Sequence, residues 1–179
     1  MVYVFLADGF EETEALVPVD VMRRSGIEVR TVGVGKKTVT GSHKITVTAD
    51  ITSDEISLDR SLEMIVLPGG MPGTLNLGNS QDVLKAIKFC SDNNNYIAAI
   101  CAAPSILGKN GYLNNKEFTC FPGFEDECKG GLYVSEKVVV YDNYITAKGA
   151  GVALDFSFEL VKLLLDEKVA SRIKSQMQC

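Results

Sequence analysis

The chain has 179 residues, a formal net charge of -5 and a pI near 5.0. This acidic balance argues against nucleic acid as the main partner, because phosphate binding needs clustered basic side chains. With 46% hydrophobic and 23% charged residues, the composition excludes a disordered chain and indicates one globular domain, residues 1–179, with a full hydrophobic core.

The apolar runs and the first residues bear on location. No apolar run approaches the roughly 20 residues that a membrane span requires. The opening MVYVFLADGFEETE has neither the basic start nor the small-residue cleavage site of a signal peptide. We therefore expect a cytoplasmic protein with no membrane partner.

The first part of the chain predicts a strand, a helix, a strand and a hairpin. Residues 2–7 form a continuous apolar run, typical of a strand buried on both faces. A helix is predicted within 8–26, because acidic residues open this segment and basic residues followed by glycine close it. Pro18 predicts a kink or a break in that helix. A strand at 27–34 precedes a segment, 36–50, that alternates around a Gly-Ser turn like a hairpin.

The middle of the chain predicts two more buried strands with a helix between them. The strand at 63–67 runs into the PGG at 68–70. An amphipathic helix is predicted at 80–94, with Ser80 as its cap. The next strand is predicted at 96–101.

The remainder predicts a short helix at 103–111, two short strands within 136–149, and closing helices within 151–176. Strands that alternate with helices indicate an α/β fold, with a mainly parallel sheet covered on both faces. A site is expected beyond the carboxyl ends of the central strands, where the segments ADGFEE, LPGG and AICAAP lie.

Cys101 lies where a predicted strand gives way to a helix. A nucleophile on such a turn is exposed to substrate and faces the partial positive charge of the helix start, which favours the reactive thiolate. Free backbone N–H groups near Ala102 and in the PGG segment are candidate donors to a developing oxyanion. The alternative is that Cys101 is a small buried core residue, as most free cysteines are.

The other cysteines have no activating neighbours. The five cysteines show no CxxC spacing and there is one histidine, which argues against a zinc site and a disulfide framework. Cys90 is expected in the core or on a helix surface, Cys128 in an inert loop after the acidic FEDE, and Cys179 at the chain end.

Acid–base chemistry needs a partner for the thiol. A thiol protease or amidotransferase uses histidine, and His43 lies in the predicted hairpin, where a solvated side chain is the ordinary outcome. Protease activity is therefore not expected. Glu11, Glu12 and Glu14 are the remaining candidates, although they are also ordinary helix-start charges and spacing does not choose among them. A glutamate buried beside Cys101 would have a raised pKa and share a proton with sulfur.

Three segments together resemble a known family. DGFEETEALVPVDVMRRSGIEV, VLPGGMPGTLNL and AAICAAPSIL are similar to the ThiJ/PfpI superfamily, closest to the clade of the parkinsonism-associated protein deglycase and its bacterial relatives. The similarity runs nearly end to end. It implies a flavodoxin-like three-layer α/β sandwich, a homodimer, and a cysteine on a nucleophile elbow, with no cofactor or metal.

The resemblance also implies roles for particular residues. Cys101 matches the family's nucleophile, and Glu14 matches the protonated glutamate that hydrogen-bonds the sulfur. Gly69, Gly70 and Ala102 match the backbone oxyanion donors.

One departure from the family pattern is Phe121, in TCFPGF, where many relatives carry histidine. Because phenylalanine cannot move protons, mechanisms that need this histidine are in doubt. Its neighbour Cys120 is expected to be a packed thiol, with a disulfide to Cys101 as the less favoured alternative.

Two functions use the same residues. The first is detoxification of reactive dicarbonyls or glycated adducts by a glyoxalase III-like or deglycase-like reaction, with Cys101 as nucleophile and Glu14 as acid/base. The second is a redox-responsive stress protein or chaperone in which Cys101 is oxidised to sulfinic acid. A dimer interface is expected at the first helix and the hairpin at 38–48, which would bring His43 to the rim of the site as an auxiliary residue.

Overall fold

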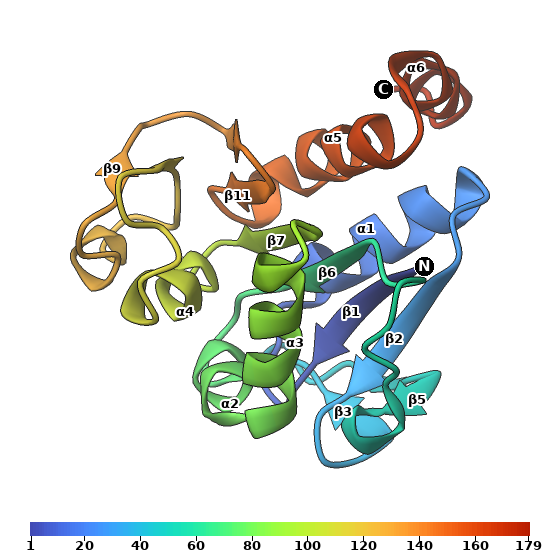
Figure 1. Ribbon diagram of the computed structural model, residues 1–179. Helices are drawn as coiled ribbons and strands as arrows, with labels where there is room; N and C mark the ends of the chain where they lie inside the picture. The colour runs from blue at the N-terminus through green and yellow to red at the C-terminus, as the bar shows by residue number, and fades with distance from the viewer.

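The computed structural model describes residues 1–179, and a seven-stranded sheet forms its centre (Figure 1). Its strands are β1 (Val2–Leu6), β2 (Val29–Gly33), β5 (Ile51–Thr52), β6 (Met64–Leu67), β7 (Tyr96–Ile100), β10 (Val138–Tyr141) and β11 (Tyr144–Ala147). They lie in the order β10-β11-β7-β6-β1-β2-β5, and all pairs are parallel except β10 with β11. The predicted α/β architecture with a mainly parallel sheet is confirmed.

Helices cover both faces of the sheet, as Figure 1 shows. They are α1 (Glu12–Arg24), α2 (Gly73–Asn79), α3 (Gln81–Asp92), α4 (Pro104–Lys109), α5 (Ala153–Leu164) and α6 (Glu167–Gln176). Residues of α1, α5 and α6 share one buried cluster, and residues of α2, α3 and α4 share another. None of the helices is long and apolar enough to cross a membrane.

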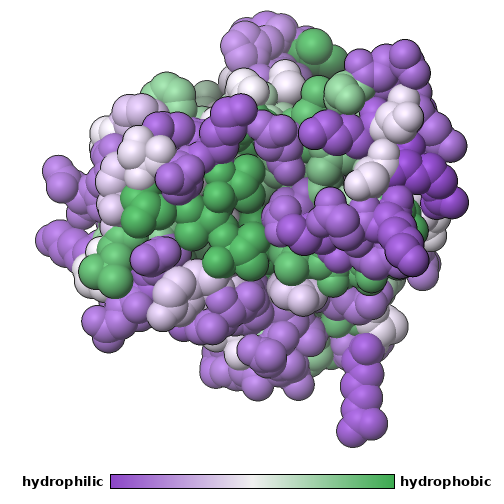
Figure 2. Space-filling view, turned by 90° about the horizontal axis from the view of Figure 1, so that it is seen from above, coloured by the Kyte–Doolittle hydropathy of each residue, from purple (hydrophilic) through white to green (hydrophobic).

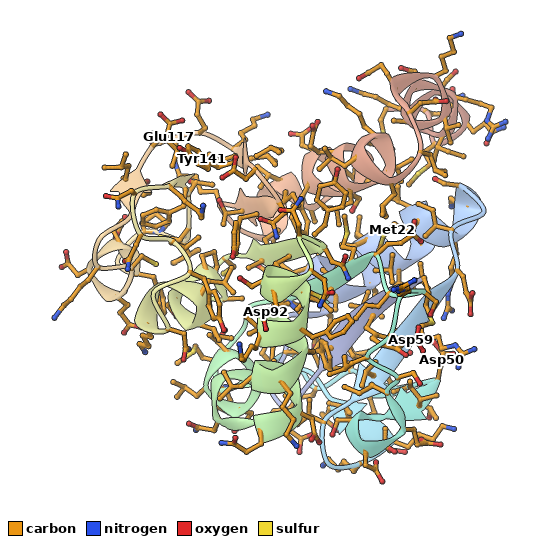
Figure 3. The ribbon with its side chains drawn as sticks, viewed as in Figure 1. Met22, Asp50, Asp59, Asp92, Glu117 and Tyr141 are labelled. Atoms are coloured by element: carbon orange, nitrogen blue, oxygen red, sulfur yellow. The ribbon has the colours of Figure 1, made fainter.

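The central strand β1 contributes side chains to both clusters, because successive side chains of a strand point to opposite faces of the sheet. Val4 and Leu6 join the cluster that contains Met22 of α1, a residue labelled in Figure 3. Phe5 points to the other face and joins the cluster that contains Ile87 of α3. Burial on both faces explains why this strand reads as an uninterrupted apolar run.

Helix α1 differs from its prediction in two ways. It begins at Glu12 rather than near the end of β1, because the Glu11 side chain caps it by accepting a hydrogen bond from the Glu14 N–H at 2.7 Å. It also continues through Pro18 to Arg24, so the expected break does not occur. Its buried face packs into the core, and this tertiary packing outweighs the one hydrogen bond that proline removes.

The predicted hairpin is present, but it forms a small sheet of its own. Strands β3 (Thr38–Thr40) and β4 (Thr46–Thr48) pair antiparallel, separate from the central sheet. A second small sheet joins β8 (Glu117–Phe118) to β9 (Leu132–Tyr133), and sequence patterns did not predict it because each strand has two residues. Helix α2 was also missed, since its two glycines lower helix propensity.

Short 3₁₀ turns complete the element list: η1 (Ser53–Glu55), η2 (Glu125–Glu127) and η3 (Ala150–Val152). Ser80 caps α3 as predicted. The predicted closing helices are α5 and α6, and Asp166 caps the second of them.

A polar link fastens α1 to the outer strands. Asp50, labelled in Figure 3, accepts hydrogen bonds from the Thr31 N–H at 2.8 Å and from the Arg23 guanidinium at 2.6 Å.

Figure 2 shows the molecule from above, a face that is mainly hydrophilic with an apolar area near its middle.

Strand order determines where a site can form. Strands β1, β6 and β7 are adjacent and parallel, so their carboxyl ends lie at one edge of the sheet. The chain lays β2 on one side of β1 and β6 on the other, which makes the gap between β1 and β6 the switch point where ligands bind in such folds.

Candidate active site

Cys101 lies directly after β7 in a strained conformation. Its φ is 65°, a left-handed value that non-glycine residues seldom adopt. Two backbone hydrogen bonds of 2.8 Å hold it there: its N–H donates to the Ala147 carbonyl, and its carbonyl accepts from the Phe121 N–H. This is the tight strand-to-helix turn that the sequence predicts, and it leaves the side chain only partly buried.

Glu14, on the first turns of α1, is fully buried and reaches the same place. Its Oε2 accepts a hydrogen bond from the Gly69 N–H at 2.8 Å, while its Oε1 is buried without a partner. A carbon added at Gly149 would lie 3.9 Å from Glu14 Oε1 and 4.0 Å from Cys101 Sγ. The carboxylate and the sulfur therefore flank one small space, which Gly149 leaves open.

The pKa of Glu14 is raised to about 7, chiefly because burial disfavours the charged carboxylate. The nearby charge of Glu11 adds to the shift, whereas hydrogen bonds from Cys101 and from the Gly69 N–H oppose it. Glu14 is thus poised between its acid and base forms near neutral pH, the condition that suits a proton-transfer group.

The Cys101 thiol differs from its prediction. Burial, and then the charge of Glu14, raise its pKa to about 12, although the N–H groups of Ala102 and Gly70 act in the opposite direction. Burial and the charge of Glu14 thus act against the thiolate that the strand-to-helix turn is expected to favour. Helix α4 begins only at Pro104 and has six residues, so its field is outweighed by desolvation. Because Cys101 and Glu14 each shift the pKa of the other, they titrate as a coupled pair.

The candidate oxyanion donors divide into two groups. The N–H groups of Gly70 and Ala102 act on the sulfur of Cys101, and neither donates to another backbone carbonyl. Gly69 differs, because its N–H already donates a hydrogen bond to Glu14 Oε2. In this structure it is therefore not free to act as a third oxyanion donor, contrary to expectation. A carbon added at Gly69 would lie 2.7 Å from Cys101 Cβ, so only glycine fits there.

Phe121 forms an apolar wall beside this space. Its Cδ2 would lie 3.4 Å from a carbon added at Gly149, and 47% of the residue is exposed. Apart from each other, the one ionisable side chain that shifts the pKa of Glu14 or Cys101 is Glu11, which acts on Glu14. No side chain stands in for the histidine of the family.

Three of the remaining cysteines, Cys90, Cys120 and Cys128, are buried, and Cys179 is exposed at the chain end. All five cysteines are free, so Cys101 and Cys120 are not bridged. Burial raises the pKa of Cys90, Cys120 and Cys128 to about 12 in each case. Cys128 packs against Gly108, in whose place a side-chain carbon would meet the sulfur at 2.8 Å.

His43 contacts Glu12 and thereby joins the hairpin loop to α1. Its Nδ1 lies 2.9 Å from Glu12 Oε2 and 3.9 Å from Glu11 Oε1, and 71% of its side chain is exposed. Neither of these contacts reaches Cys101 or Glu14. The three side chains place possible ligand atoms within 4.8 Å of one another, and these atoms are engaged in fastening the loop to α1.

Gly149 was missed at the sequence level. It follows β11, a fourth strand that ends at the same edge as β7, and the small residues of KGAG were the available signal.

Comparisons with known proteins place the chain among the members of one family. The model of the DJ-1/PfpI family matches residues 1–163. The chain is 34% identical to the Parkinson disease protein 7 homolog of Danio rerio, over 97% of this chain and 94% of the relative. It is 31% identical to Deglycase TK1284 of Thermococcus kodakarensis, over 91% of this chain and 98% of that protein.

Solved structures show the same fold. The DJ-1 superfamily protein STM1931 from Salmonella typhimurium superposes with a TM-score of 0.94 at 32% identity, covering 99% of this chain and 97% of the other. Oxidized Toxoplasma gondii DJ-1 also gives 0.94, at 28% identity, with coverage of 99% and 97%. The predicted family and flavodoxin-like fold are confirmed.

Proposed function

Because this chain belongs to the DJ-1/PfpI family, we propose that it is a cofactor-independent enzyme that converts reactive dicarbonyls or their early adducts. The observation that carries the proposal is the buried Glu14, with one oxygen fixed by Gly69 and the other beside the space that Cys101 flanks. The deglycase name of one relative supports it.

The first step uses the raised pKa of Glu14. The Glu14 carboxylate accepts the thiol proton while the Cys101 sulfur bonds to the aldehyde carbon of methylglyoxal. The former carbonyl oxygen becomes an oxyanion, which the N–H groups of Gly70 and Ala102 stabilise until it takes the proton back from Glu14. The product of this step is a hemithioacetal.

The second step moves hydrogen between neighbouring carbons. Glu14 removes the proton from the carbon bound to sulfur and delivers it to the adjacent carbon, while the hydroxyl proton moves to the former ketone oxygen. The hemithioacetal thereby becomes a thioester of lactate. Water then cleaves the thioester, releasing lactate and restoring the thiol. The sum is methylglyoxal plus water to lactate, and no metal or cofactor enters the balance.

Lactate formation tests the proposal directly. Fully reduced protein is incubated with methylglyoxal, and both lactate enantiomers are measured beside a Cys101→Ser control. We expect turnover that the substitution lowers by at least roughly 100-fold, since it removes the nucleophile. Equal turnover by the two proteins would refute the proposal.

A second function is favoured by one comparison: a structural neighbour is described as oxidized. In this alternative, Cys101 takes up two oxygen atoms from peroxide to become a sulfinic acid, and protonated Glu14 donates a hydrogen bond to it. Mass spectrometry after two equivalents of peroxide, one for each oxygen atom added, tests this function. Negligible dicarbonyl turnover together with selective oxidation of Cys101 would favour it over the enzyme.

A further inference from the structure

Glu11 is an unusual capping residue at the start of α1. It lies directly before the first helical residue, and its carboxylate accepts a hydrogen bond from the Glu14 N–H at 2.7 Å. Serine, threonine, aspartate and asparagine are the preferred residues at this capping position, and glutamate is not among them. Residues that depart from such a local preference are often found at functional sites.

Three hydrogen bonds join Glu11, Gly69 and Glu14 into a closed ring. The Glu11 N–H donates to the Gly69 carbonyl at 2.9 Å, and the Gly69 N–H donates to Glu14 Oε2 at 2.8 Å. The Glu14 N–H then donates to Glu11 Oε2, which closes the ring. The Glu14 residue is therefore held at both ends, its backbone by Glu11 and its carboxyl by Gly69.

The ring also orients an oxyanion donor. The Gly69 carbonyl and the Gly70 N–H belong to one planar trans peptide group, so they point in opposite directions. Because the Gly69 carbonyl is bound to Glu11, the Gly70 N–H is directed to the other side, where it acts on the sulfur of Cys101. This peptide group packs closely on α1, since a carbon added at Gly70 would lie 2.4 Å from the Glu11 nitrogen.

The Glu11 carboxylate also has an electrostatic effect that a neutral cap would lack. Its negative charge disfavours a second charge on the buried carboxyl nearby and so adds to the raised pKa of Glu14. Cys101 is the other titratable side chain that acts on Glu14. The His43 ring approaches Glu11 to 3.9 Å, but its nearer partner is Glu12 at 2.9 Å. The Glu11 side chain is 15% exposed, so solvent screens its charge only in part.

We propose that Glu11 is a positioning residue of this site, which fixes the acid–base group Glu14 through its side chain and the Gly70 donor through its N–H. Its negative charge also keeps the Glu14 carboxyl protonated to a higher pH than burial alone would. Glu11 itself neither touches substrate nor exchanges a proton in the reaction. Its contribution to turnover rests on the proposed function, whereas its effect on Glu14 does not.

Two substitutions separate the charge of Glu11 from its hydrogen bond. Glu11→Gln keeps an oxygen that can accept from the Glu14 N–H and removes the charge, whereas Glu11→Asp keeps both a charge and a capping carboxylate. Asp166→Ala is the matched control. Asp166 caps α6 by accepting a hydrogen bond from the Val169 N–H at 2.8 Å, and α6 contributes no residue to the site.

The protonation of Glu14 is measured without chemistry, by carbon-13 NMR of its side-chain carboxyl signal as a function of pH. Glu11→Gln should lower the pH midpoint by about 0.5 to 1, because a like charge is removed from beside the carboxyl. Glu11→Asp and Asp166→Ala should leave the midpoint unchanged. An unmoved midpoint in Glu11→Gln, or an equal shift in Asp166→Ala, would overturn the inference.

Opening the ring tests the orienting role. Glu11→Ala removes the acceptor for the Glu14 N–H, so kcat/KM at its high-pH plateau should fall about tenfold. Glu11→Gln and Asp166→Ala should keep the plateau of the unmodified protein. Full plateau activity in Glu11→Ala would overturn the orienting role, and if this variant does not fold, the titration of Glu11→Gln decides.

Kinetics separate this inference from the proposed function. In the lactate assay, the rise of kcat/KM with pH should move to lower pH in Glu11→Gln by the same amount as the Glu14 midpoint. Lactate formation with an unmoved profile and an unmoved midpoint would overturn the inference and leave the proposed function intact. A moved midpoint in a protein that forms no lactate would refute the proposed function and uphold the effect of Glu11 on Glu14.

Discussion

Burial of Glu14 destabilises its charged form and at the same time gives it a pKa that suits proton transfer. A carboxyl group buried beside sulfur has its pKa raised from 4.5 to about 7, mainly by desolvation. A raised pKa means that the favourable contribution to stability is present below pH 4.5 and is lost as the pH rises through 7. At pH 8 the ionised side chain therefore destabilises the fold.

Replacing Glu14 with glutamine removes this cost and the reaction together. We expect Glu14→Gln to raise the free energy of unfolding at pH 8 by about 1 to 3 kcal/mol, with the gain shrinking toward pH 4.5. Lactate formation should fall by at least roughly 100-fold. Denaturant unfolding at several pH values and the lactate assay measure the two effects.

The same titration shapes the activity of the unmodified protein. The carboxylate form of Glu14 is needed to accept the thiol proton, so kcat/KM should rise with pH around an apparent pKa near 7. A flat profile between pH 6 and 8, or undiminished turnover by Glu14→Gln, would contradict its role as the base.

Gly149 keeps the reactive space open. A methyl group there would lie 3.4 Å from Phe121 Cδ2, 3.9 Å from Glu14 Oε1 and 4.0 Å from Cys101 Sγ. The fold should therefore tolerate it. We expect Gly149→Ala to retain the thermal midpoint but to lower kcat/KM by about 10- to 100-fold, because it occupies the place of the substrate. A variant that folds normally and keeps full activity would show that substrate binds elsewhere.

At the scale of elements, the first turn of α1 does three things with three glutamates. Glu11 caps the helix, Glu12 holds the hairpin loop and Glu14 faces the sulfur. Glu12 accepts hydrogen bonds from the His43 N–H at 2.8 Å and from its ring at 2.9 Å. Although burial raises the pKa of Glu12, these hydrogen bonds hold it below its ordinary value.

Loss of this anchor should loosen the hairpin. We expect Glu12→Ala to lower the free energy of unfolding by about 1 to 3 kcal/mol, since it removes part-buried hydrogen bonds to a charged carboxylate, and to speed amide exchange at His43 and Ile45. Because its pKa is lowered, Glu12 stabilises the fold above its unfolded pKa, and that contribution is lost below pH 4.5.

The control for the hairpin anchor is Asp20→Ala on the same helix. Asp20 forms an exposed ion pair with Arg24 at 2.8 Å, and such pairs contribute about 0.3 to 0.5 kcal/mol. Equal losses from the two substitutions, measured by denaturant unfolding and hydrogen exchange, would show that Glu12 is an ordinary surface charge.

At the scale of the whole molecule, we expect a homodimer through α1 and the β3–β4 hairpin. Ile45, in the hairpin loop, is 54% exposed, and burying such a side chain against a second copy is favourable. Ile45→Asp should weaken dimerisation by at least about tenfold. Light scattering at micromolar concentration measures this effect, with Leu132→Asp, at a residue 55% exposed on β9, as the control. A monomeric native protein would contradict the expectation.

Local sequence signals determined much of the fold. Apolar runs identified β1, β6 and β7 as buried strands, and alternation identified the hairpin, because both patterns depend on neighbouring residues alone. The Cys101 turn was also readable from sequence, since a strand and a helix meet there within a few residues. The family resemblance added Glu14, which local patterns did not separate from Glu11 and Glu12.

Tertiary structure decided the properties that depend on distant residues. The pKa values of Glu14 and Cys101 follow from burial between α1, the Gly69 loop and the end of β7, and no local pattern reports that burial. The engagement of Gly69 and the space at Gly149 likewise arise where segments far apart in the chain meet. The sequence by itself thus determined the strands, the turn and the family, whereas the electrostatics and the shape of the site required the packed fold, because desolvation and steric space are properties of the assembled neighbours.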